Sequence, residues 1–117
     1  MGRKVSDGRS VRVTVPQNTT IEAGKFYLLD GFFGLAVQSV TTGSGETAEV
    51  ILNCEQAEYE TSQITTTDDF NKGDLVYWNA GTNLLTTQES SDNRLVGRVT
   101  QAKDTNNVIW FKLGPQV

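Results

Sequence analysis

Gly24–Lys25–Phe26–Tyr27–Leu28–Leu29–Asp30 and Gly73–Asp74–Leu75–Val76–Tyr77–Trp78–Asn79 follow one pattern. Each stretch begins with glycine and a charged residue, continues with four large apolar residues and ends in a residue that favours turns. Each is followed by a segment that begins with glycine and then by a β-prone run. These later pieces are Gly34–Gln38 and Glu49–Leu52 in the first copy, and Gly97–Gln101 and Val108–Phe111 in the second. The order predicts a duplicated three-strand unit that serves as a scaffold.

The whole chain favours an all-β fold. Its short apolar runs recur at intervals of about 8–12 residues with turn residues between them, which is typical of a small antiparallel β-barrel or sandwich. At 117 residues it suits one domain. We expect an extended basic N-terminal arm with one edge strand in residues 1–19, and a single all-β domain in residues 20–117. The core is expected to form around Phe26, Leu28, Val76 and Trp78.

The strands can be placed approximately from the alternation and the turns. Asp30–Gly31 predicts a hairpin turn because glycine tolerates positive φ. In the third strand, Ala48, Val50, Leu52 and Cys54 make the better core face. One short helical turn is expected at Thr67–Phe70. The expected strands are Val11–Val15, Lys25–Leu29, Gly34–Thr41, Glu46–Cys54, Tyr59–Ile64, Asp74–Trp78, Leu84–Thr87, Leu95–Ala102 and Asn107–Leu113.

The charge is unevenly distributed. Residues 1–25 carry five basic and two acidic residues, a net +3, whereas the other 92 carry five basic and twelve acidic, a net −7. A basic arm on an acidic body is suited to contacting an acidic neighbour, including another copy of the chain; the alternative is a loose terminus with incidental charge. The acidic body disfavours nucleic acid as the main ligand.

Several classes of function are disfavoured by what the sequence lacks. There is no histidine, which removes the commonest neutral-pH base and zinc ligand. The single cysteine, Cys54, cannot form an internal disulfide and is expected to be buried and inert. No apolar stretch reaches the roughly 20 residues of a membrane helix, and the N-terminus lacks the apolar region of a signal peptide. We expect synthesis in the cytoplasm, no catalysis, no cofactor and no metal.

Two acidic groups leave alternatives open. Asp68, Asp69 and Asp74 resemble a carboxylate site, but their spacing does not match a calcium loop, and a solvated turn with a helix cap is favoured. Glu55, Glu58 and Glu60 are interpreted either as solvated charge or as a contact for a basic partner, such as the arm of another subunit.

The paired aromatic residues suggest surfaces. Neighbouring residues on a strand face opposite sides, so periodicity places at most one of each pair in the core. The pair Phe32–Phe33 follows a turn and is either a lid on the core or part of a subunit interface. Outward aromatics, including Trp78 or Trp110, also allow a carbohydrate- or host-surface-binding β module.

A set of short motifs recurs in a defined order along the chain. The motifs are Ala23–Phe26, Gly34–Ala36, Lys72–Trp78, Val96–Val99 and Val108–Leu113. Taken in this order, they resemble the DUF2190 family of small tailed-phage and prophage proteins, and the resemblance covers about residues 20–114.

This resemblance implies a cement protein that binds the outside of the phage capsid and stabilises it. The implied partners are the major capsid protein and other copies of the chain, as a homotrimer or a dimer, with the protein on the exterior of the virion. The arm, residues 1–19, lies outside the resemblance, and its role is inferred from its charge and its alternating strand. The residues expected to contact the capsid or neighbouring subunits are Arg3, Lys4, Arg9, Val11, Arg12, Val13, Val15, Phe32 and Phe33.

Overall fold

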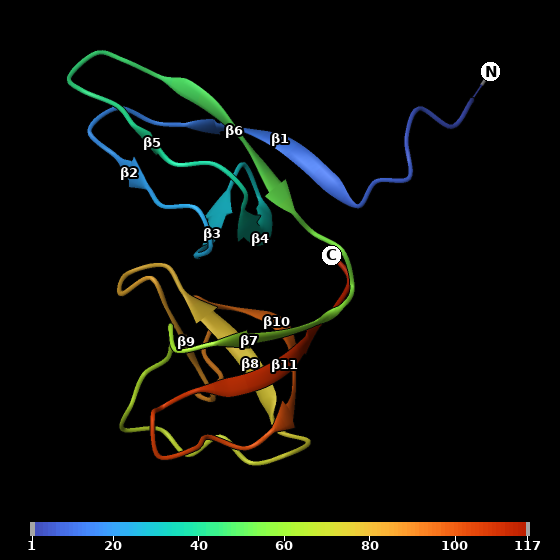
Figure 1. Ribbon diagram of the computed structural model, residues 1–117, viewed down its shortest axis with the longest axis vertical. Helices are drawn as coiled ribbons and strands as arrows, with labels where there is room; N and C mark the ends of the chain where they lie inside the picture. The colour runs from blue at the N-terminus through green and yellow to red at the C-terminus, as the bar shows by residue number, and fades with distance from the viewer. Residues whose placement is uncertain (1, 117) are drawn as a thin grey trace. The chain divides into compact units, whose positions relative to one another are not determined.

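The computed structural model describes residues 2–116, and within them the regular structure consists of eleven β-strands without a helix (Figure 1). This confirms the all-β prediction. No helix that could span a membrane occurs in this part of the chain. The chain divides into two compact units, Met1–Glu55 and Gln56–Val117. The strands are β1 Ser10–Val15, β2 Thr20–Ile21, β3 Phe26–Leu29, β4 Phe32–Ala36, β5 Val40–Thr41, β6 Ala48–Asn53, β7 Glu58–Thr61, β8 Leu75–Asn79, β9 Leu84–Thr86, β10 Asn93–Gln101 and β11 Ile109–Leu113.

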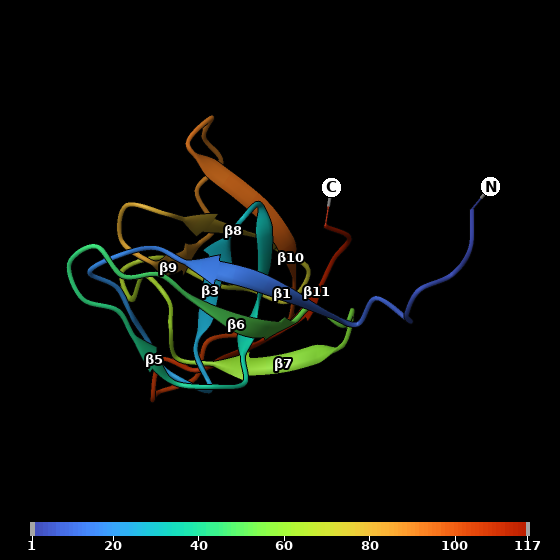
Figure 2. The ribbon, with the colours of Figure 1, turned by 90° about the horizontal axis from the view of Figure 1, so that it is seen from above.

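The first unit contains a four-stranded antiparallel sheet in the order β1-β6-β4-β3, and a small β2-β5 ladder. Figure 2 shows β1 running beside β6. Asp30 and Gly31 form the β3–β4 turn, both with positive φ, as the sequence predicts. The segment expected as one strand from Gly34 to Thr41 is split, because β4 ends at Ala36 and β5 begins at Val40.

The core of the first unit is built from alternating strand residues. On β6, Val50 and Leu52 are buried, and Cys54 follows on the same side, which confirms the predicted core face and the buried cysteine. On β1, Val13 and Val15 are buried, while Thr14 between them is exposed. The buried cluster consists of Val13, Val15, Ile21, Ala36, Val50, Leu52 and Cys54.

The β3–β4 hairpin is apolar on both faces. Tyr27, Leu29 and Phe32 pack against the core cluster. On the opposite face, Phe26 and Phe33 stack with ring centroids 5.3 Å apart and are both buried. Phe26 is therefore buried as expected but on the face away from the cluster, and Leu28 on the same face is only half-buried.

The second unit contains a five-stranded antiparallel sheet in the order β7-β11-β10-β8-β9. The segment after β7 also bonds to β9: Thr65 donates its N–H to the Leu85 carbonyl at 2.8 Å, and Leu85 donates to the Gln63 carbonyl at 2.9 Å. These bonds curl the sheet, because its two end strands are drawn toward each other. Val76 and Trp78 are buried, as predicted.

The predicted duplication is present in the backbone. Gly24 donates its N–H to the Ala36 carbonyl at 2.9 Å, and Ala36 donates back to the Lys25 carbonyl at 2.9 Å. In the second copy, Gly73 donates to the Val99 carbonyl at 2.9 Å, and Val99 donates to the Asp74 carbonyl at 2.8 Å. Both glycines have positive φ, +89° and +94°, a conformation that favours glycine.

The second glycine of each copy is required for a different reason. A Cβ placed on Gly34 would lie 2.6 Å from the carbonyl oxygen of Asn53, and one on Gly97 would lie 2.2 Å from that of Lys112. Asn53 and Lys112 occupy matching positions on the third strand of each copy. Each copy therefore brings this strand too close to the glycine for any side chain.

The structure adds a fourth strand to each copy. β1 pairs with β6 in the first unit, and β7 pairs with β11 in the second. At matching positions, Cys54 donates its N–H to the Arg9 carbonyl at 2.7 Å, and Leu113 donates to the Ala57 carbonyl at 3.0 Å. The repeat is thus a four-stranded unit, with β1 or β7 as its first strand and edge.

Candidate interaction surface

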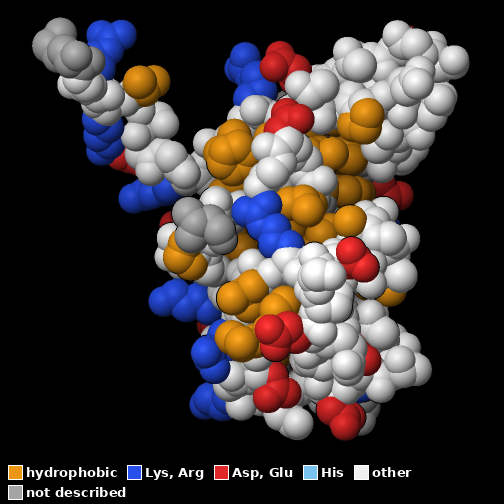
Figure 3. All heavy atoms as spheres, turned by 180° about the vertical axis from the view of Figure 1, so that it is seen from behind, with side chains coloured by type: hydrophobic (Ala, Val, Ile, Leu, Met, Phe, Trp, Pro, Cys, Tyr) orange, Lys and Arg blue, Asp and Glu red, His pale blue; other side chains and the backbone are white. Residues whose placement is uncertain are grey.

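The N-terminal tail, defined here as residues 2–9, is exposed throughout and leads into β1 (Figures 1 and 3). Lys4 forms an ion pair with Asp7 at 2.6 Å. Val5 is the most exposed large hydrophobic residue described, at 89%. At the end of the tail, the Arg9 carbonyl is held by the Cys54 N–H. The tail therefore carries accessible charge and one apolar side chain.

Three arginines near the N-terminus have exposed guanidinium groups. Within residues 2–116, Arg3, Arg9 and Arg12 take part in no ion pair. Lys25 differs, because it pairs with Glu22 at 2.5 Å. The hydrogen bond that Lys25 donates to the Glu22 carboxylate, together with the negative charge of Glu22, raises the pKa of Lys25 above its ordinary value. Much of the basic charge available to a partner is thus carried by the three arginines.

The apolar residues predicted on the arm lie mostly in the core. Val13 and Val15 are buried, and Val11 is half-buried and packs against the core cluster. Arg12 lies between them and faces outward. A contribution of the two buried valines to an interface would therefore be indirect, by holding β1 in its sheet.

The two phenylalanines have different surroundings. Phe33 is 1% exposed and stacks on Phe26, so it fits the role of a core residue among the two alternatives. Phe32 is half-buried against the core cluster and retains some accessible surface.

Two of the three aspartates considered for a carboxylate site, Asp68 and Asp74, make structural contacts. Asp68 accepts hydrogen bonds from the Thr86 hydroxyl and from the Thr87 N–H, the latter at 3.2 Å. Asp74 accepts a bond from the Asn71 N–H at 2.9 Å, which fixes the turn before β8. The expected helical turn at residues 67–70 does not form; a non-helical turn lies at residues 66–67. Within residues 2–116, no group of three or more potential metal ligands is found.

Glu58 and Glu60 are exposed on the edge strand β7, and Glu55 is exposed just before it. Trp110 lies opposite Glu60 in the ladder and is 38% exposed, whereas Trp78 is 1% exposed. Of the two tryptophans considered for carbohydrate binding, only Trp110 therefore has a sizeable accessible surface.

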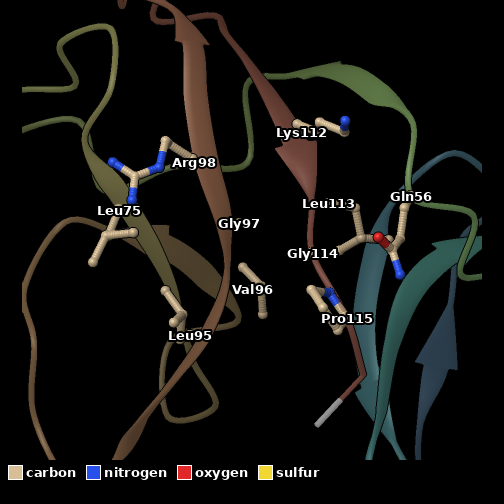
Figure 4. Close-up of a pocket in the computed structure, with 10 residues that line it drawn as sticks. All are labelled: Gln56, Leu75, Leu95, Val96, Gly97, Arg98, Lys112, Leu113, Gly114 and Pro115. Carbon is tan, nitrogen blue, oxygen red and sulfur yellow. The ribbon is translucent and has the colours of Figure 1, made fainter.

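An apolar groove in the second unit was not anticipated (Figure 4). It has a volume of about 520 Å³ and includes Leu75 and Leu95, which are 37% and 48% exposed. Arg98 lies at its edge and donates a hydrogen bond of 2.5 Å to the Gly73 carbonyl. This groove was not predicted, because both leucines stand in apolar runs that alternation alone assigns to core strands.

These features define a β protein with several exposed surfaces. Its charged tail, edge strands and apolar groove are suited to contacts with other proteins. The family of phage cement proteins matches residues 5–113, and the chain belongs to that family. No curated protein and no solved structure shows significant similarity to it. Family membership indicates a structural role in association with the phage capsid, as part of the virion.

Proposed function

We propose that the protein binds the outer surface of the capsid shell, through the major capsid protein, and stabilises the shell. The family match supports a role at the capsid. The observation that carries the proposal further is the tail: exposed arginines without ion pairs on a segment that leads out from an edge strand. Such a segment matches an acidic groove or strand edge on a neighbouring protein.

The remaining parts of this proposal follow from the same picture. The protein would be made in the host cytoplasm and placed on the capsid exterior, where copies act as a homotrimer or a dimer. Many weak contacts repeated over a lattice give a high total affinity. No catalysis, cofactor, membrane or direct nucleic-acid contact is part of the proposed role.

The test is co-sedimentation with expanded capsids. Deleting residues 1–15 would remove Val13 and Val15 from the core, so the deletion should stop at residue 8 and keep Arg9. We expect this truncation and the double variant Arg3→Gln/Arg9→Gln each to reduce capsid binding, with a weaker dependence on salt.

A matched control removes the same charge elsewhere. Lys72 and Lys112 are exposed in the second unit, so Lys72→Gln/Lys112→Gln should leave binding close to that of the wild type. Equal binding by the truncation, the arginine variant and the wild type would exclude the tail as the capsid contact.

A second candidate function is a carbohydrate- or host-surface-binding module on the virion. It is supported by the exposure of Trp110, since an aromatic face can stack on a sugar ring. Binding on a glycan array that disappears in Trp110→Ala would favour it. Absence of binding by the wild-type protein would exclude the glycans tested.

A further inference from the structure

The first strand of each repeat lies at the edge of its sheet, so some of its backbone N–H and C=O groups are available to a partner. Among the strands of residues 2–116, β1 pairs only with β6, and β7 pairs only with β11. In an antiparallel ladder, successive residues direct their N–H and C=O groups to opposite sides. The bonds to the Arg9 and Ala57 carbonyls show which residues face the sheet. Ser10 and Arg12 on β1, and Glu58 and Glu60 on β7, therefore direct these groups outward. These two outward sides are called the open edges below.

Both open edges are short. Beyond Arg12, the N–H of Thr14 is capped by the Asp30 carboxylate at 2.7 Å. Beyond β7, Gln63 and Thr65 bond to Leu85 of β9. Each edge can accept only a short partner strand. The unpaired N–H and C=O groups of an exposed edge are a site at which another chain can pair.

The two open edges carry opposite charges at the same place in the repeat. The ladders place Val11 opposite Leu52 and Tyr59 opposite Phe111, which are matching core positions. One residue further along, Arg12 in the first repeat corresponds to Glu60 in the second. Both side chains are exposed. The first edge is thus cationic, and the second, with Glu58 and Glu60, is anionic.

These charges discriminate between the ways in which two copies can pair. Pairing of two β1 edges would bring Arg12 of one copy close to Arg12 of the other. Pairing of two β7 edges would bring the glutamates of both copies together. Like charges directly opposite each other destabilise a strand pair, whereas opposite charges stabilise it. The charges therefore disfavour a two-fold contact at either edge and favour a contact between unlike edges.

We propose that the open edge of β1 in one copy pairs antiparallel with the open edge of β7 in a second copy. The outward backbone groups set the register: Arg12 lies opposite Glu58, and Ser10 opposite Glu60. In this register Val11 lies opposite Tyr59, and both are half-buried residues on the inner face of their sheets. The pair thus combines a charge contact on one face with an apolar contact on the other.

A contact between unlike edges leaves one free edge of each kind on the resulting pair. Further copies add in the same way, and the assembly either closes into a ring or continues as a chain. This inference concerns self-association, so it does not rest on capsid binding.

Cross-linking tests the register directly. Residues in a hydrogen-bonded antiparallel pair have Cα atoms about 5.5 Å apart, a separation that a disulfide can bridge. Arg12→Cys and Glu58→Cys are prepared separately, mixed and oxidised. We expect a disulfide-linked dimer in the mixture and monomer in each variant alone. Wild type controls for Cys54, which is buried.

The matched control is a mixture of Arg12→Cys and Glu49→Cys, since Glu49 is exposed on β6, an inner strand of the sheet. Cross-linking of that mixture to the same extent would overturn the proposal. So would a dimer of either edge variant alone, which indicates a two-fold contact, or the absence of dimer from the edge mixture.

Charge reversal gives an independent measurement in solution. Arg12→Glu and Glu58→Arg should each weaken self-association by about tenfold in light scattering at low salt, because each places like charges opposite each other. Combining them in one chain should restore association, which a merely structural effect would not do. Failure to restore it contradicts the proposed pairing. The substitutions Arg3→Gln/Arg9→Gln are expected to reduce capsid binding, but they should leave the cross-link between copies unchanged. This difference separates the two proposals.

Discussion

The two repeats have the same backbone pairing and different surfaces. At matching positions on the second repeat strand stand Leu35 and Arg98, and on the third stand Asn53 and Lys112. The first repeat joins β3 and β4 by the short Asp30–Gly31 turn, whereas the second inserts β9 and two loops between β8 and β10. The pairs of backbone hydrogen bonds at Gly24 and Gly73 are the same in both. Backbone geometry therefore requires the glycines in both repeats. The outward positions are not restricted in this way and can differ to suit different binding partners.

The largest effect is expected from emptying matching core positions. Leu52 and Phe111 are both fully buried. Phe111→Ala should destabilise the protein by about 3–5 kcal/mol and Leu52→Ala by about 2–5 kcal/mol, because each removes buried surface and leaves a cavity. Urea denaturation followed by far-UV circular dichroism measures both. Val37→Ala, at a position that is 52% exposed, should change stability by less than about 0.5 kcal/mol. Equal losses at the exposed and the buried positions would contradict the assignment of the core.

The next effect concerns the close approach of strands at Gly34 and Gly97. Alanine at either site should destabilise by about 1–3 kcal/mol or more, because the added Cβ meets a backbone carbonyl. Gly97→Ala should be the worse of the two, since its contact would be 2.2 Å against 2.6 Å at Gly34. Thermal unfolding ranks them, with Gly2→Ala as the control because no atom lies near that position. The reverse ranking would show that the second repeat adjusts its strands more easily than the first.

A smaller effect is expected at the first glycine of each repeat. Gly24 and Gly73 have positive φ, and no atom lies within 4 Å of the position that a Cβ would occupy. Alanine should therefore cost only the strain of the backbone, about 1–2 kcal/mol, and the same amount in both repeats. Asparagine, which tolerates positive φ better, should cost less in denaturation experiments. A large difference between the two sites would break the equivalence of the repeats.

The smallest effect is at the exposed Lys25–Glu22 pair, which has no counterpart at Asp74. Glu22→Gln should return the Lys25 pKa toward its ordinary value of 10.5, because it removes the charge that raises it. Since the folded-state pKa is raised, any stabilisation is present below pH 10.5 and is lost as the pH rises through the folded value. The pair is exposed, so stability at neutral pH should be unchanged. An NMR titration of the lysine signals measures the shift, and an unchanged pKa would contradict the contact.

Much of the fold could be predicted because both core packing and backbone conformation restrict the residues of the duplicated motif. Val50 and Leu52 must fill a core, and the motif glycines must permit a turn or a close approach. The alignment of the copies chosen from sequence, with Glu49–Leu52 against Val108–Phe111, agrees with the ladders, which pair Leu52 with Ala36 and Phe111 with Val99. The expected core nevertheless combined Phe26 and Leu28 with Val76 and Trp78, although the residues matching Val76 and Trp78 are Tyr27 and Leu29. In a hairpin that is apolar on both faces, the alternation of apolar and polar residues does not show which face packs in the core.

The first strand of each repeat could not be matched from sequence. Ser10–Val15 and Glu58–Thr61 have little in common as residues. An edge strand pairs on one side only, so its outward-facing positions accept many different side chains. For the same reason, the opposite charges at Arg12 and Glu60 become comparable only after the ladders establish that the two positions match.

The sequence by itself determined the all-β class, the duplication, the positions of the required glycines and the basic character of the N-terminus. These properties depend on local conformation and on short-range patterns of apolar residues. Only the tertiary structure decided that each repeat has four strands, and that Val13, Val15 and Phe33 are buried while Arg12 is exposed. It also decided the groove: the ladder between β10 and β8 shifts between Leu95 and Gly97, which leaves Val96 buried and Leu95 exposed. A shift of one residue exchanges the two faces of a strand, and the partner strand, rather than the strand's own sequence, selects the register.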